Sequence, residues 1–129
     1  MTTDSGCEAC WSQDAAVAWE RVTRAPIEAY LIDETHFIVS IRRCRACSRN
    51  YLQVTTETID WDDGEDPIQR TVMPITPAER LELLDPRSTV SELALAAVGP
   101  GRRALRYDWP KGTDPGVYWG TGVLIPPHD

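Results

Sequence analysis

The stretch IRRCRACSRNYLQV, residues 41–54, places two cysteines three positions apart between two runs that are typical of β-strands. A second pair lies in GCEAC, residues 6–10, near the N-terminus. A Cys-x-x-Cys turn supplies two thiolate ligands, and two such turns complete the tetrahedral four-thiolate site that is typical of structural zinc. The sequence therefore predicts a structural Zn²⁺ site with four ligands: Cys7, Cys10, Cys44 and Cys47.

Four cysteines also allow a redox or a disulfide interpretation. A thiol–disulfide enzyme usually places one Cys-x-x-Cys at the start of a helix in a βαβ unit, and neither pair has that setting in the sequence. Structural disulfides are rare in the cytoplasm, where we expect this chain to reside. We therefore favour zinc and leave open a site that releases its metal on oxidation. Four protein thiolates leave no coordination position for water, so we expect a structural metal and no enzyme activity.

The interval between the two pairs has consequences for the fold. Thirty-three residues separate Cys10 from Cys44, more than the ~15–20 of the standard pattern, so the interval must contain a helix and strands. In its cysteine pattern, over about residues 5–60, the chain resembles zinc-ribbon and treble-clef-like zinc domains. The resemblance implies that the second pair forms the turn of a β-hairpin. Ser48 and Arg49 depart from the commonest ribbon pattern, in which glycine frequently follows the last cysteine.

The overall composition is that of an ordinary globular protein. The chain has 129 residues, 42% of them hydrophobic and 26% charged, which is enough to bury a core without cross-links. Its net charge of −7 argues against nucleic acid or an anionic membrane as the main partner. No apolar stretch reaches the ~18–20 residues of a membrane span, and the N-terminus lacks a secretory pattern, so we expect a cytoplasmic protein. Twelve arginines against one lysine are typical of a GC-rich, bacterial genome.

Hydrophobic patterning predicts an α+β fold: a mostly antiparallel sheet, a zinc-ribbon-like site with four cysteines, and two or three short helices. We expect one domain over residues 1–129, with a zinc-knuckle half at about 5–60 and a half containing helices and a C-terminal hairpin at about 61–129. β-branched and aromatic residues predict strands over residues 27–33, 36–43, 51–61, 68–75, 104–109 and 117–125.

Helix signals occur in three segments, 12–25, 76–85 and 89–98, although Val17, Trp19 and Arg21 of the first also fit the alternation of a strand. Ser12 is the candidate N-cap of the first helix. In the second, Thr76 followed three residues later by Glu79 predicts a capping box. Thr89 and Glu92 repeat the same pattern at the start of the third.

The two histidines do not belong to a catalytic motif. His36 lies at the start of a predicted strand, and His128 lies one residue from the C-terminus. The sequence contains no Gly-rich phosphate loop, no Gly-x-Ser-x-Gly and no His-Glu-x-x-His. We therefore expect no catalytic residue and no cofactor other than zinc.

An acidic run follows the third predicted strand. Its carboxylates miss the spacing of an EF-hand calcium loop, and charge clusters on turns commonly serve solubility alone. A sharper interpretation is a contact surface for a basic protein partner, with an aromatic anchor. On this hypothesis the protein is a regulator, an assembly factor or an immunity-type inhibitor. The partner-binding residues would be Asp60, Trp61, Asp62, Asp63, Glu65 and Asp66.

A nucleic-acid-binding zinc ribbon is the alternative function. Basic residues surround the second cysteine pair, namely Arg42, Arg43, Arg45 and Arg49. Together with Tyr51 they could hold phosphates and stack a base. The net charge of −7 counts against this alternative.

Overall fold

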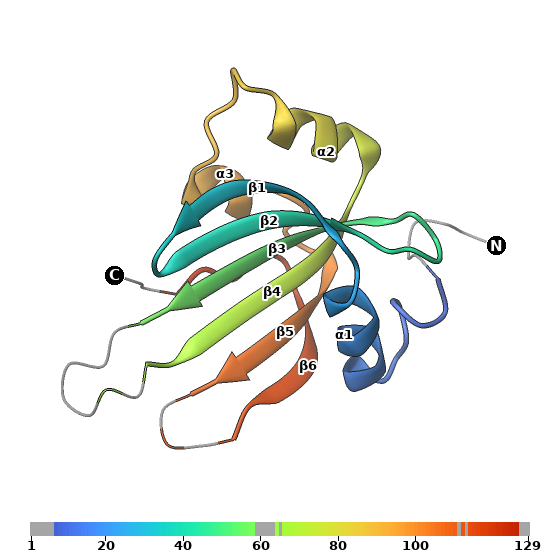
Figure 1. Ribbon diagram of the computed structural model, residues 1–129, viewed down its shortest axis with the longest axis vertical. Coiled ribbons are helices and arrows are strands. Elements are labelled where there is room, and N and C mark those ends of the chain that lie inside the picture. The colour runs from blue at the N-terminus through green and yellow to red at the C-terminus, as the bar shows by residue number, and fades with distance from the viewer. Residues whose placement is uncertain (1–6, 59–63, 65, 111, 113, 127–129) are drawn as a thin grey trace.

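The computed structural model describes residues 7–58, 64, 66–110, 112 and 114–126. In these ranges the chain forms a six-stranded antiparallel sheet and three helices, which confirms the predicted α+β class (Figure 1). The strands are β1 (Ile27–Glu34), β2 (Phe37–Arg43), β3 (Asn50–Glu57), β4 (Ile68–Ile75), β5 (Arg103–Trp109) and β6 (Gly116–Thr121). The helices are α1 (Ala15–Thr23), α2 (Pro77–Leu84) and α3 (Glu92–Ala96).

The sheet is a meander, because its spatial order is the order of the strands along the chain. Each strand pairs antiparallel with the next, and the β2–β3 pair keeps one register from Phe37↔Thr56 to Arg43↔Asn50. One sheet therefore runs through both the cysteine-rich segment and the C-terminal half.

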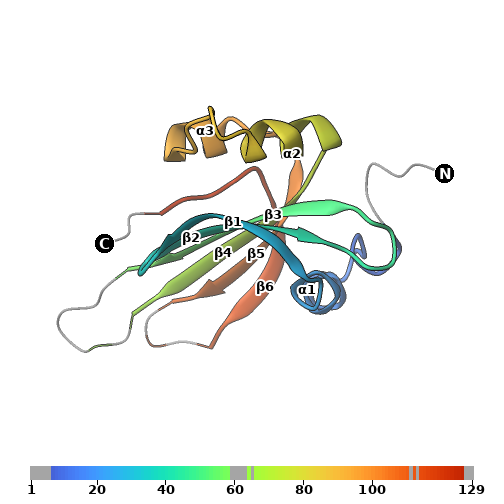
Figure 2. The same ribbon diagram turned by 45° about the horizontal axis from the view of Figure 1, so that its top comes forward.

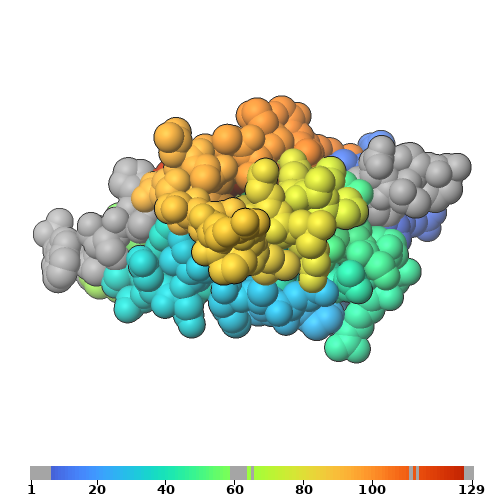
Figure 3. Space-filling model, turned by 90° about the horizontal axis from the view of Figure 1, so that it is seen from above, coloured from blue at the N-terminus to red at the C-terminus, as the bar shows by residue number. Residues whose placement is uncertain are grey.

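The helices cover opposite faces of the sheet (Figure 2). On one face α2 and α3 close the larger core, and Figure 3 shows them, with the segment between them, at the centre of the view from above. Leu83 of α2 and Leu95 of α3 meet the strands there, while Val123 and Ile125 pack against the same cluster from the C-terminal segment. The sheet contributes Phe37, Val39, Ile41, Leu52, Val54 and Ile75.

On the other face, α1 closes a smaller core. Its residues Ala18 and Val22 are fully buried. Trp19 of the same helix stacks on Tyr107 of β5, with ring centroids 5.2 Å apart and an interplanar angle of 15°. The other buried members of this core are Cys10, Cys44, Tyr51, Val72 and Leu105. Two of the four predicted metal ligands thus belong to a packed core rather than to an exposed loop.

The start of α2 confirms the predicted capping box. The Glu79 backbone N–H donates to Thr76 Oγ1 at 3.1 Å, and the Thr76 N–H donates to Glu79 Oε1 at 2.8 Å. Arg102 adds two hydrogen bonds to the Glu79 carboxylate and lowers its pKa.

Two other predicted N-caps are wrong. Asp14 rather than Ser12 caps α1, and Ser91 rather than Thr89 caps α3. In both cases two capping residues stand two positions apart, so local sequence does not distinguish them. The choice is made by packing, because each helix begins where its buried residues, such as Leu95, reach the core.

A buried arginine of β5 forms hydrogen bonds with the end of β6 and with the residue that follows it. Arg106 of β5 is only 7% exposed. Its Nη1 donates to Thr71 Oγ1 and to the Gly122 carbonyl, each at 2.8 Å. Its Nη2 donates to the Thr121 carbonyl at 2.6 Å. Gly120 leaves room for this side chain, because a Cβ there would lie 2.9 Å from the Arg106 Nε atom.

Candidate metal centre

The sulfur atoms of the two cysteine pairs form one cluster. The Sγ–Sγ distances are 3.3 Å for Cys7–Cys10, 3.8 Å for Cys7–Cys44 and 3.7 Å for Cys10–Cys47. All four atoms lie within 4.8 Å of one another. Zn–S bonds of ≈2.3 Å place the sulfur atoms of a tetrahedral site about 3.8 Å apart. The four predicted ligands therefore lie together in an arrangement compatible with zinc.

Two tight turns present these sulfur atoms. Cys44 and Cys47 lie in the β2–β3 turn, as the zinc-ribbon resemblance implied. This turn is closed by the Cys44 N–H on the Arg49 carbonyl at 2.9 Å and by the Ser48 N–H on the Cys44 carbonyl at 2.8 Å. The first pair precedes α1, where the Trp11 N–H donates to the Cys7 carbonyl at 3.0 Å.

Ser48 explains how the second turn departs from the ribbon pattern. Its φ angle is +63°, the left-handed conformation in which glycine is favoured. The chain thus keeps the backbone conformation of a glycine-containing turn but places a side chain there. The second turn therefore differs from the ribbon pattern in the residue type at position 48 and not in its backbone conformation.

Replacing Ser48 by glycine should raise the free energy of unfolding by about 0.5–1 kcal/mol, because the positive φ then costs no Cβ clash. Urea denaturation of the zinc-loaded protein measures this change. Ala46→Gly, in the same turn but without a positive φ, is the matched control and should not stabilise. An equal gain in both variants would contradict the explanation.

Tyr51 supports the cluster from β3. Its hydroxyl group donates to Cys10 Sγ at 2.9 Å. Burial raises the pKa of Tyr51, and the contact with Cys10 raises it further, so the hydroxyl remains a donor. Tyr51 is only 1% exposed, so its ring is not accessible for stacking on a base. The sequence did not indicate this role, because it depends on the face of β3 that meets α1.

Tyr51→Phe should weaken zinc affinity roughly tenfold or more, because hydrogen-bond donors around metal ligands hold and stabilise them. Competition with a chromogenic chelator measures the affinity. Tyr118→Phe removes a hydroxyl from a half-exposed tyrosine and serves as the control. Equal zinc affinity in the two variants would exclude a role for the Tyr51 hydroxyl.

Burial and hydrogen bonding act in opposite directions on the pKa values of the thiols. Burial raises the pKa of Cys10 and of Cys44. At Cys7 burial acts in the same direction, but hydrogen bonds from the Cys10 backbone and from the other cysteines lower the pKa to about 7. A bound dication deprotonates its thiol ligands and offsets the cost of burying their charge.

An arginine between two tryptophans holds the segment after the first pair on the sheet. The Arg103 guanidinium carbon lies 3.6 Å from the centre of the Trp119 ring and 4.5 Å from that of Trp11. Arg103 Nη2 and Trp119 Nε1 both donate to the Ser12 carbonyl, at 2.8 Å and 3.0 Å. These contacts join residues far apart in sequence, which is why sequence reasoning missed them.

The four arginines around the second cysteine pair have different surroundings and roles in the structure. Arg42 turns inward, where its Nε donates to Gln53 Oε1 at 2.6 Å. Its Nη1 donates to the carbonyl groups of Ala25, at 2.6 Å, and Thr23, at 3.3 Å, and so binds the C-terminal end of α1. Arg42 is therefore a structural residue of the α1–sheet contact.

The other three arginines of this group differ in their surroundings. Arg43 lies 3.3 Å from Glu28 and is half-exposed. Arg45 is exposed in the turn, and Arg49 is partly buried. Of the proposed local basic patch, Arg42 and Arg43 thus have partners within the protein, and Arg45 lies exposed in the turn.

Most of the acidic run lies outside the described residues. Only Asp66 is described, in a half-buried position before β4. The five others are Asp60, Trp61, Asp62, Asp63 and Glu65. His128 also lies outside, while His36 Nδ1 is 2.8 Å from Glu57 Oε1, at the end of β2 remote from the cysteines.

Comparisons with known proteins do not add a family. No family model, curated protein or solved structure matches this chain. Among the helices that the structure describes, none is long and apolar enough to cross a membrane.

Proposed function

We propose that this protein is a small acidic zinc-binding domain without catalytic activity that acts by binding another protein. The observation that carries the metal assignment is the cluster of four Sγ atoms within 4.8 Å of one another. The ligands would be Cys7, Cys10, Cys44 and Cys47. With four protein thiolates around it, the ion would cross-link the turn before α1 to the β2–β3 turn and would carry no reactive water.

The protein-binding part of the proposal is supported by charge. The net charge is −7, and residues 60–66 carry five carboxylates beside Trp61. Such a segment would orient a basic partner and speed its encounter. Candidate roles are a regulator, an assembly factor or an immunity-type inhibitor. The proposed setting is a bacterial cytoplasm, where thiols stay reduced and available to a metal.

Metal content tests the zinc assignment directly. Native mass spectrometry on protein purified without added metal should give one zinc per chain. A thiol titration should then find four reactive thiols only after denaturation or chelation. Metal-free protein with two reducible disulfides would refute the assignment and favour the redox alternative.

Partner capture tests the protein-binding part. Cross-linking in an extract of the source cells should recover one protein whose yield falls in the variant Asp62→Asn/Asp63→Asn/Glu65→Gln. The control Asp33→Asn/Glu34→Gln/Glu82→Gln removes the same charge from exposed positions elsewhere. Equal losses in the two variants would show a general effect of charge and not a contact at residues 60–66.

The nucleic-acid alternative is less well supported by the structure. Arg42 is engaged with α1, and Tyr51 is buried against Cys10. Binding of single-stranded RNA or DNA with a steep salt dependence, lost in Arg43→Glu/Arg45→Glu, would favour it over protein binding.

A further inference from the structure

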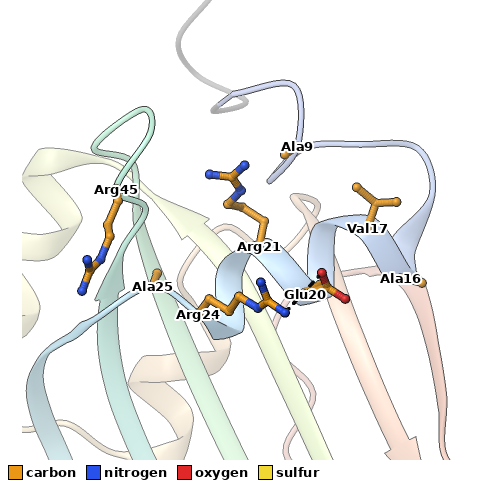
Figure 4. Close-up of a pocket in the computed structure, with 8 residues that line it drawn as sticks. All are labelled: Ala9, Ala16, Val17, Glu20, Arg21, Arg24, Ala25 and Arg45. Carbon is orange, nitrogen blue, oxygen red and sulfur yellow. Dashed lines mark ion pairs between the residues drawn. The ribbon is translucent and has the colours of Figure 1, made fainter.

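A hollow of about 500 Å³ lies beside the candidate metal centre, between α1 and the two cysteine-containing turns (Figure 4). Three arginines line it, one from α1, one at the C-cap of α1 and one from the β2–β3 turn: Arg21, Arg24 and Arg45. Among the described residues of the lining, Glu20 is the single acidic one. The remaining lining residues are apolar, with Ala9 on the first turn and Val17 on α1.

The helical periodicity of α1 determines which of its residues line the hollow. Val17 and Arg21 lie four residues apart and so share one face of α1, and the C-cap residue Arg24 follows three positions later. The face toward the sheet carries Ala18 and Val22, which are fully buried. In Figure 4 the side chains of Val17 and Arg21 extend from α1 toward the loop that carries Ala9.

The three arginines of the hollow differ in their ion pairs. Arg24 pairs with Glu20 at 3.5 Å, and both side chains are largely exposed. Arg21 and Arg45 form no ion pair within the part of the chain that the structure describes. An excess of positive charge therefore faces this hollow, although the chain as a whole carries −7.

The described hydrogen bonds to the cysteine sulfur atoms come from groups other than these arginines. In the described residues the cysteine sulfur atoms receive hydrogen bonds from backbone N–H groups, from one another and from the Tyr51 hydroxyl. Arg21 and Arg45 instead line the hollow. Guanidinium groups in this position suit a planar carboxylate, which they can bind in a bidentate manner.

We propose that this hollow binds an acidic peptide segment of a partner protein. Carboxylate side chains would pair with Arg21 and Arg45, and aliphatic side chains would contact Val17 and the alanines. An open site of this size holds a few residues of a chain that continues beyond it. This contact is opposite in polarity to the one proposed for residues 60–66.

The hollow should exist only when the metal centre is assembled. Ala9 lies between Cys7 and Cys10, and Arg45 lies between Cys44 and Cys47. Each cysteine-containing turn therefore contributes one side of the hollow. A metal ion bound by both turns would hold these two sides together. Only this metal dependence rests on the proposed zinc function.

An NMR titration with a blocked peptide of alternating glutamate and leucine tests the proposal on the zinc-loaded full chain. We expect amide shifts at Ala9, Val17 and Arg45. Arg21→Gln and Arg45→Gln should each weaken binding about tenfold, the value of one charge-assisted hydrogen bond. Arg87→Gln removes the same charge from an exposed position after α2 and should leave binding unchanged.

Several results would overturn the proposal. One is the absence of binding by protein that contains one zinc per chain, which would leave the zinc assignment intact. Another is an equal loss of affinity in Arg87→Gln. Stronger binding of oligothymidylate or of inorganic phosphate, with the same arginine dependence, would replace the peptide by another anion. Peptide binding that survives removal of zinc by a chelator would refute the metal dependence.

Discussion

Replacing Cys44 by serine should remove the zinc ion and much of the stability of the protein. Because the unfolded chain does not present a preformed site, metal-binding free energy adds to folding free energy. At free zinc a thousandfold above Kd, this contribution is about 4 kcal/mol, a large part of the ~5–15 kcal/mol that stabilises a typical domain. Thermal and urea denaturation, with metal content measured on the same samples, test the prediction.

Ala46→Ser provides the control for this experiment. It introduces the same side chain two residues away, at an exposed position of the same turn, and removes no ligand. It should keep one zinc per chain and nearly the stability of the parent protein. Unchanged melting and unchanged metal content in Cys44→Ser would refute the four-thiolate site.

The loss in Cys44→Ser should not be uniform over the molecule. Cys10 and Cys44 belong to the smaller core, with Ala18 and Val22 of α1. The larger core, on the opposite face, contains none of the cysteines. Hydrogen exchange should therefore accelerate in α1 before it accelerates in β2 and β3 residues such as Val39 and Val54.

Arg106→Leu should lower the free energy of unfolding by about 3 kcal/mol, because it leaves the buried Thr71 hydroxyl and the buried Gly122 carbonyl without this donor. The carbonyl groups of Thr121 and Gly122 both accept from this guanidinium. Without these hydrogen bonds, the C-terminal segment that packs on the larger core would be released. Urea denaturation measures the effect, and zinc content should stay at one per chain because the cysteines lie on the other face.

Arg87→Leu is the matched control for Arg106→Leu. The Arg87 side chain is 89% exposed, and its partner Asp85 lies at the surface. The same change of residue there should have little effect on stability. Equal stability of the Arg106→Leu and parent proteins would show that water replaces the guanidinium without cost.

Much of the fold was predictable because its signals are local. Alternating β-branched and aromatic residues marked the strands, and the predicted segments 68–75 and 104–109 agree closely with β4 and β5. The Thr76–Glu79 capping box marked α2, because its hydrogen bonds join residues only three positions apart. The four-cysteine cluster was also predictable, since two Cys-x-x-Cys turns have few uses other than one shared metal.

The amino-acid sequence by itself thus determined most of the strands and helices, but not the N-caps of α1 and α3, together with the set of candidate metal ligands. The tertiary structure alone decided which residues support that set. Tyr51 reaches Cys10 over 41 positions, and Trp119 reaches Ser12 over 107. Arg42 was predicted as part of a binding surface but binds the end of α1 instead. Such contacts depend on which faces of distant elements meet, and no local spacing in the chain encodes that.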